Sequence, residues 1–151
     1  MINDKLKMKG ELQIVLSSPN KDDQLVEVNN LVVDTGLAYI AGRMKDATSG
    51  VMTHMAVGAG TTAAAATDTT LESELARVTL TSTSNVTTNV TDDAVQYVAT
   101  FLPGTGTGAV TEAGTLNDPT TGTMLCRTVF PVINKGASDT LTITWKITIE
   151  A

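Results

Sequence analysis

The sequence has little of several residue types on which common kinds of site depend. Of its 151 residues, one is cysteine and one is histidine, which excludes an intramolecular disulfide and any Cys/His set with zinc spacing. Aromatic residues make up 3%, which disfavours the stacking surfaces of sugar-binding and single-strand-binding proteins. The net charge of −6 disfavours contact with nucleic acid, because nucleic-acid binders carry a basic patch. No apolar run approaches the ~20 residues that span a membrane, so no membrane contact is expected.

The N-terminus, Met1-Ile2-Asn3-Asp4-Lys5, has no apolar signal stretch. We therefore expect synthesis in a reducing cytoplasm, where Cys126, in an apolar run, is a small core residue. The only basic cluster is formed by Lys5, Lys7 and Lys9. It is either a solvated tail or an arm that docks on an acidic neighbouring subunit.

Threonine takes the place of much of the missing charge. Charged residues are 17% of the chain, against a usual share of about 25%, and threonine is a β-branched residue that fits a pleated, half-exposed surface. The clearest pattern lies over residues 140–149, where apolar residues alternate with threonine and lysine. This pattern predicts a strand with one buried face, formed by Leu141, Ile143, Trp145, Ile147 and Ile149.

Similar alternation, or apolar runs bounded by turn residues, predicts further strands over 10–17, 24–33, 51–58, 76–81, 95–101, 109–116 and 124–133. The first two are predicted to form a β-hairpin. One helix is expected near 36–44, capped by Asp34 or Thr35, with an apolar stripe of Leu37, Ile40, Ala41 and Met44. The capping-box spacing of Thr69 to Glu72 predicts a helical turn over about 70–74. Residues 58–67 and 82–93 are expected to be loops.

About eight strands, one helix and long loops predict an all-β fold. The expected architecture is an antiparallel two-sheet β-sandwich, jelly-roll or Ig-like, with one short helix and an N-terminal arm and hairpin. We expect three parts: a flexible N-terminal arm over 1–9, a β-hairpin extension over 10–33 and the β-sandwich domain over 34–151.

Candidate catalytic patterns are incomplete. His54 lies within a strand pattern, and no G-x-S-x-G nucleophile elbow accompanies it. Gly58 and Gly60 do not extend to the full G-x-G-x-x-G pattern, because position 63 is alanine. Carboxylate pairs at 22–23 and 92–93 fall in predicted turns and lack EF-hand spacing for calcium. We expect no enzymatic activity, no cofactor and no metal. Glu72, Glu74 and Arg77 are expected to form a local salt-bridge group that braces a turn.

Three segments carry a resemblance to a known family. They are residues 54–62, with Gly58-Ala59-Gly60, residues 68–77, with Thr69-Thr70-Leu71-Glu72-Ser73-Glu74 and Arg77, and residues 111–116, with Glu112-Ala113-Gly114. Together with the strand-to-helix segment 31–41, they resemble the tail-collar fibre module of tailed-bacteriophage and prophage structural proteins. The resemblance covers about residues 29–149 and implies a structural role in the virion, without catalysis.

The resemblance leaves two virion roles open. The first is a capsid decoration or cement protein that binds the major capsid protein, and the second is a neck or tail component such as a fibre adaptor or a baseplate-peripheral protein. Fibre modules of this family normally continue into a shaft, whereas this sequence ends at the module's last strand, which favours a small particle component. Homo-oligomer formation is expected in either role. A glycan-binding or glycan-cleaving module is a third, disfavoured alternative.

Candidate contact residues lie in the arm and in two loops rich in small residues, which permit close backbone approach. The same loops are equally compatible with flexible, solvated segments. The candidates are Lys5, Lys7, Lys9, Thr61, Thr62, Gly104, Gly106 and Gly108.

Overall fold

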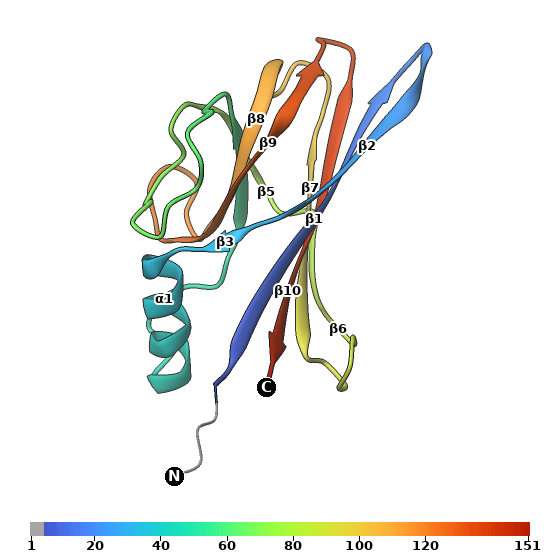
Figure 1. Ribbon diagram of the computed structural model, residues 1–151. Helices are drawn as coiled ribbons and strands as arrows, with labels where there is room; N and C mark the ends of the chain where they lie inside the picture. The colour runs from blue at the N-terminus through green and yellow to red at the C-terminus, as the bar shows by residue number, and fades with distance from the viewer. Residues whose placement is uncertain (1–4) are drawn as a thin grey trace.

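Two antiparallel five-stranded sheets pack face to face in the computed structural model, which describes residues 5–151 (Figure 1). Sheet A has the order β2 (Lys21–Asn29), β1 (Lys7–Ser18), β10 (Thr140–Glu150), β7 (Ala94–Phe101) and β6 (Ser82–Val86). Sheet B has the order β3 (Leu31–Val32), β9 (Met124–Lys135), β8 (Gly108–Leu116), β4 (His54–Gly58) and β5 (Glu74–Thr79). With one helix, α1 (Asp34–Lys45), this arrangement confirms the predicted all-β two-sheet sandwich.

The main core lies between the two sheets and follows the predicted alternation of β10. Leu141, Ile143, Trp145 and Ile147 are at most 4% exposed, and each buried side chain of this size stabilises the fold by about 2 kcal/mol. Ile149 departs from the pattern because it is 46% exposed. At that end of sheet A the facing element is α1 rather than sheet B, so the covering layer is incomplete (Figure 1).

The β1–β2 hairpin is present, but it is not an extension of a separate domain. β1 pairs with β10 from Lys7 opposite Glu150 to Ser17 opposite Thr140, which makes it an interior strand of sheet A. The predicted flexible arm is therefore wrong for residues 7–9, which begin β1. Residues 1–4 of that arm lie outside the described residues. The strand starts this early because Met8, Gly10 and Leu12 continue the inward-facing alternation of β1.

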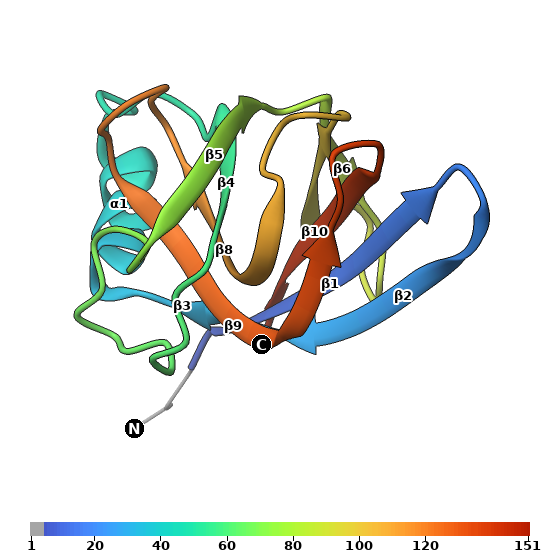
Figure 2. The ribbon, with the colours of Figure 1, turned by 90° about the horizontal axis from the view of Figure 1, so that it is seen from above.

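Sheet B is covered on both faces. Its inner face meets sheet A, while its outer face lies under the start of α1 and the loop over 59–73 (Figure 2). The outer face has a small apolar cluster of its own, so the whole of β8 from Val110 to Leu116 is buried. Its members are Val33, Ala56, Leu71, Leu116 and Met124.

The helix buries a different face from the predicted stripe. Leu37 and Met44 are 52% and 80% exposed, while Gly36 is buried against β9. A Cβ at Gly36 would lie 2.2 Å from the Leu125 carbonyl oxygen, so glycine allows the helix backbone to approach the strand. The predicted cap is also wrong. Val33 is the N-cap residue, and the Thr35 hydroxyl donates instead to the Met124 carbonyl at 2.9 Å.

Two local predictions fail in the middle of the chain. Residues 70–74 contain no helical turn, and the loop predicted over 82–93 contains the strand β6. β6 pairs with β7 from Ser82 opposite Val98 to Val86 opposite Ala94. A sequence of serine, threonine and asparagine shows no apolar alternation, so this strand depends on pairing with its neighbour. No helix within residues 5–151 has the length and apolar character needed to cross a membrane.

Candidate functional site

A buried ion pair on the outer face of sheet B is the centre of the most concentrated polar network in the described chain. It joins Glu112 of β8 to Arg127 of β9, whose side chains are 0% and 3% exposed. The Arg127 Nε and Nη2 groups donate to Glu112 Oε2 at 3.0 and 2.9 Å. Burial of two charges is tolerated only where each is paired and hydrogen-bonded. The stability of this ion pair therefore depends on the groups that surround it.

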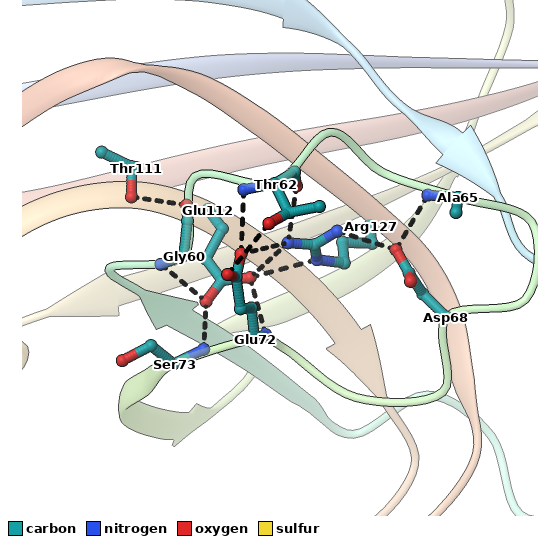
Figure 3. A network of polar contacts seen from close by, with 9 residues as sticks. All are labelled: Gly60, Thr62, Ala65, Asp68, Glu72, Ser73, Thr111, Glu112 and Arg127. Atoms are coloured by element: carbon teal, nitrogen blue, oxygen red, sulfur yellow. Dashed lines mark hydrogen bonds and ion pairs between the residues drawn. The ribbon is translucent and has the colours of Figure 1, made fainter.

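The Glu112 carboxylate also receives both ends of the loop 59–73 (Figure 3). Its Oε1 accepts the backbone N–H groups of Gly60 and Ser73 at 3.0 and 2.7 Å, and its Oε2 accepts that of Glu72 at 3.0 Å. The N–H groups of Glu72 and Ser73 lie at the start of the helical turn predicted over 70–74. In the structure they donate to Glu112 instead. The turn is replaced by a loop clamped on one carboxylate.

Arg127 holds the middle of the same loop. Its Nη1 donates to Asp68 Oδ2 at 2.7 Å, and its Nη2 donates to the Thr62 carbonyl at 3.1 Å. Glu72 Oε2 lies 3.7 Å from Nη2 and accepts the Thr62 N–H at 2.9 Å. One guanidinium and one carboxylate thus fix the loop at its beginning, middle and end.

The surrounding bonds favour the charged forms of Asp68, Glu72 and Arg127. The backbone N–H of Ala65, followed by Arg127, lowers the pKa of Asp68 below its ordinary value. The Thr62 backbone N–H does the same for the pKa of Glu72. Burial opposes the charge of Arg127, but its bonds to Asp68 and Glu112 outweigh that effect and raise its pKa. These pKa shifts favour the charged forms of Asp68, Glu72 and Arg127 at neutral pH.

Glycines make room for this network. A Cβ at Gly58 or Gly60 would lie 2.5 or 2.6 Å from Glu112 Oε1. A Cβ at Gly114 would lie 3.1 Å from the Leu71 Cδ2 atom of the loop. The glycines of the Gly-x-Gly and Glu-x-Gly segments are thus explained by close packing around one carboxylate and one leucine.

The predicted salt-bridge group is confirmed for two of its three members. Arg77 donates through Nε and Nη2 to the two oxygens of Glu74 at 2.9 and 2.8 Å. Its Nη1 also donates to the carbonyls of Asp118 and Thr121, which ties β5 to the turn after β8. Glu72 does not join this group, because it belongs to the Arg127 network.

The geometry of the network suits anchoring rather than proton transfer. Both oxygens of Glu112 are engaged by five donors, and the side chain has no exposed surface. A general acid or base needs hydrogen-bond access to a substrate atom. An adjacent surface hollow of about 370 Å³ is lined by Asp68, Glu72 and Arg127, which already bind one another or the loop.

The remaining candidate groups lie apart from one another. His54 in β4 contacts the hydroxyls of Thr53 and Thr79 through its two ring nitrogens, at 2.8 and 3.4 Å. Asp23 accepts the Ser17 hydroxyl of the β1–β2 hairpin at 2.8 Å. Cys126 is buried, and burial raises its pKa to about 12. Within residues 5–151, no cluster of three or more His, Cys, Asp or Glu side chains has the arrangement of a metal site.

The predicted contact residues do not form one surface. Lys7 and Lys9 lie at the start of β1, where Lys9 Nζ pairs with Glu11 Oε1 at 2.7 Å, and Lys5 precedes that strand in an exposed position. Gly104 and Gly106 follow β7 at the opposite end of sheet A (Figure 1), and Gly108 is the first residue of β8 in sheet B. Their φ angles of +83°, +67° and +142° explain why glycine occupies all three positions.

Thr61 and Thr62 lie in the loop 59–73 and are exposed. Thr62 nevertheless belongs to the Arg127 network, because its carbonyl accepts from Arg127 and its backbone N–H and hydroxyl donate to Glu72. Among residues 5–151, neither the Lys cluster nor the glycine loop forms a hydrogen bond or ion pair with this network. The contact role of these residues stays a prediction.

The fold and this site define an all-β sandwich with one internally clamped loop. Comparisons with protein-family models, with curated proteins and with solved structures found no match to the chain.

Proposed function

We propose that this protein is a non-enzymatic structural subunit of a tailed-bacteriophage particle, and that it decorates and cements the capsid by binding the major capsid protein. The observation that supports this proposal is the convergence of the three segments that resemble the tail-collar module. Gly58 and Gly60, Leu71 and the backbone of Glu72, and Glu112 and Gly114 meet on the outer face of sheet B. The resemblance thus rests on residues that build one structural unit together.

The clamped loop suits a binding role. Loop 59–73 exposes a run of threonine and alanine, including Thr61, Ala63 and Ala66, while its backbone is fixed by Glu112 and Arg127. A loop that is ordered before binding loses little conformational entropy when a partner covers it. Small side chains also permit a close approach of two backbones at an intersubunit seam.

The outer face of sheet A offers a second surface, on which Glu11, Glu27 and Lys146 lie among polar threonine and glutamine side chains. Thr142 and Thr144 of β10 are half-buried there and lie beside Gln13 of β1 and Gln96 of β7. A subunit that binds only the assembled shell stabilises that shell by mass action. In this role the working parts of the protein are its outer surfaces.

Quantitative mass spectrometry of purified particles tests the proposal. A cement protein is expected in a copy number comparable to that of the major capsid protein. A copy number that is a small fraction of this value would assign the chain to the neck or tail instead. Absence of the protein from particles that were assembled while it was expressed would contradict a virion role altogether.

A further inference from the structure

An apolar groove of about 530 Å³ opens between α1 and the adjacent end of sheet A. Tyr39 and Met44 of α1, Val51 of the following loop, and Val95 and Ile149 of sheet A line it. Met44, Val51 and Ile149 are 80%, 54% and 46% exposed. Large apolar side chains gathered around an open groove are typical of a binding surface.

The strand β6 forms one side of this groove. Thr83 and Asn85 line the groove, and β6 is the last strand of sheet A, so the backbone edge opposite β7 is unpaired within the sheet. The groove and the strand edge therefore lie side by side. An extended peptide that paired with β6 would place alternate side chains in the groove.

Among the four edge strands formed by the described residues, β6 alone lacks a protective feature. β2 carries Lys21, Asp22, Asp23 and Glu27, β5 carries Glu74 and Arg77, and β3 has only two residues. β6 reads Ser-Thr-Ser-Asn-Val, with no charge and no proline. Proteins block sheet edges with charges, proline or short strands, so an edge that is long enough and uncharged is available for pairing.

We propose that β6 and the groove bind an extended segment of another protein by strand addition. The segment pairs its backbone with β6, places apolar side chains in the groove at every second position and carries a carboxylate near one end. Among residues 5–151, Arg43 is the only charged residue that lines the groove, and its Nη1 donates to the Ser49 carbonyl at 2.8 Å. A fixed guanidinium at an apolar groove favours a carboxylate partner.

A second copy of this chain fits the groove less well. The β6 strand of another copy would present Thr83 and Asn85 on the groove side, and these short polar side chains do not fill an apolar space. The net charge of −6 also makes two copies repel one another. The inference does not depend on the virion role, because binding of the segment is measured on the isolated protein.

Fluorescence anisotropy with a short labelled peptide tests the inference. The probe has valine and isoleucine at alternate positions, threonine between them and a terminal aspartate, and the control peptide has the same composition with its apolar residues clustered. The alternating peptide is expected to bind at least about tenfold more tightly than the clustered one. Replacing its aspartate with asparagine is expected to weaken binding, with a difference that shrinks as salt rises.

Two matched pairs of variants place the binding site. Thr83→Lys points a charge into the groove, whereas Ser84→Lys puts the same charge on the other face of β6. Met44→Glu alters the exposed rim of the groove, whereas Leu37→Glu alters an exposed position of α1 outside it. Peptide binding should weaken about tenfold or more in the first variant of each pair and change little in the second. The thermal unfolding of all four variants should be unchanged.

Equal binding of the two peptides, or equal effects within each pair of variants, would overturn the inference. Sedimentation supplies a separate test of the occupant. A concentration-dependent dimer that is lost in Thr83→Lys and kept in Ser84→Lys would assign the edge to a second copy and would also overturn it.

Discussion

The Glu112 carboxylate lies where solvent does not reach it. Its contribution to the stability of the fold therefore depends on the hydrogen-bond donors around it. Arg127 and three backbone N–H groups complete its hydrogen bonds. Removing one member of a buried ion pair leaves the other charge buried and uncompensated, which costs more than the pair itself contributes. A substitution in this network should therefore lower the free energy of unfolding more when the replaced side chain is more deeply buried.

Glu112→Gln is expected to lower the free energy of unfolding by about 3–5 kcal/mol, because the amide group faces N–H donors and leaves Arg127 without its buried partner. Glu72→Gln is the matched control, since the Glu72 side chain is 45% exposed, and its cost should be about 0–1 kcal/mol. Urea denaturation measures both values. Equal losses in the two variants would show that the buried clamp is not the important member of the network.

The sequence contains a signal for the Glu112–Arg127 pair that lies outside its recognisable motifs. Glu112 is the only charged residue in β8, and Arg127 interrupts the apolar run at the start of β9. A single charge within a buried strand requires an opposite charge on a neighbouring strand. Identifying the partner also required the register, which shifts between Val110 and Glu112 and cannot be read from local patterns.

At the scale of elements, packing and pairing between backbones determine which face of α1 is buried and where β6 forms. Apolar periodicity does not report either feature. The stripe of Leu37 and Met44 predicted one buried face for α1, but Gly36 faces β9 instead. β10 was predicted well because its alternation coincides with the burial of one sheet face. β6 was missed because its position depends on pairing with β7 and not on its own side chains.

Two glycines of α1 should respond in opposite ways to alanine. Gly36→Ala places a Cβ 2.2 Å from the Leu125 carbonyl oxygen and should destabilise the protein by about 1–3 kcal/mol through overpacking. Gly42 has open space around the corresponding position, so Gly42→Ala should stabilise by about 0.5–1 kcal/mol through a higher helix propensity. Thermal unfolding compares the two. Destabilisation by both variants would contradict the packing of α1 on β9.

The turn after β8 contains Asp118, whose ionisation should make the stability of the protein depend on pH in the acid range. The backbone N–H groups of Thr121 and Thr120 lower the pKa of Asp118 to about 2. A carboxylate whose pKa is lowered by folding stabilises the protein above its unfolded pKa, and this contribution is lost as the pH falls through the folded pKa. The relevant window lies between about pH 4 and about pH 2.

Asp118→Asn should therefore unfold at a lower temperature than the wild type at neutral pH, and the difference should narrow below about pH 4. Melting temperatures measured from neutral to acid pH provide the comparison. Gly42→Ala serves as a control, because it changes no titratable group and its offset should stay nearly constant. A difference that persists unchanged to about pH 2 would contradict the role of the ionised carboxylate.

At the scale of the whole molecule, the described residues form a two-sheet sandwich with one clamped loop, one apolar groove and one unprotected strand edge. The fold class was predictable from alternating threonine and apolar residues, since this pattern reports burial of one strand face. The proposed binding surfaces were not predictable, because they depend on which strands form the edges and where α1 leaves sheet A uncovered. A role in a particle is the proposal that uses these surfaces.

Heating of phage particles that lack this protein tests that role most directly. DNA release is followed with a dye that cannot enter intact heads, before and after purified protein is added back. If the protein cements the capsid, it binds these heads and raises the temperature at which DNA is released. Heads that neither bind the protein nor change their release temperature would contradict the proposed function.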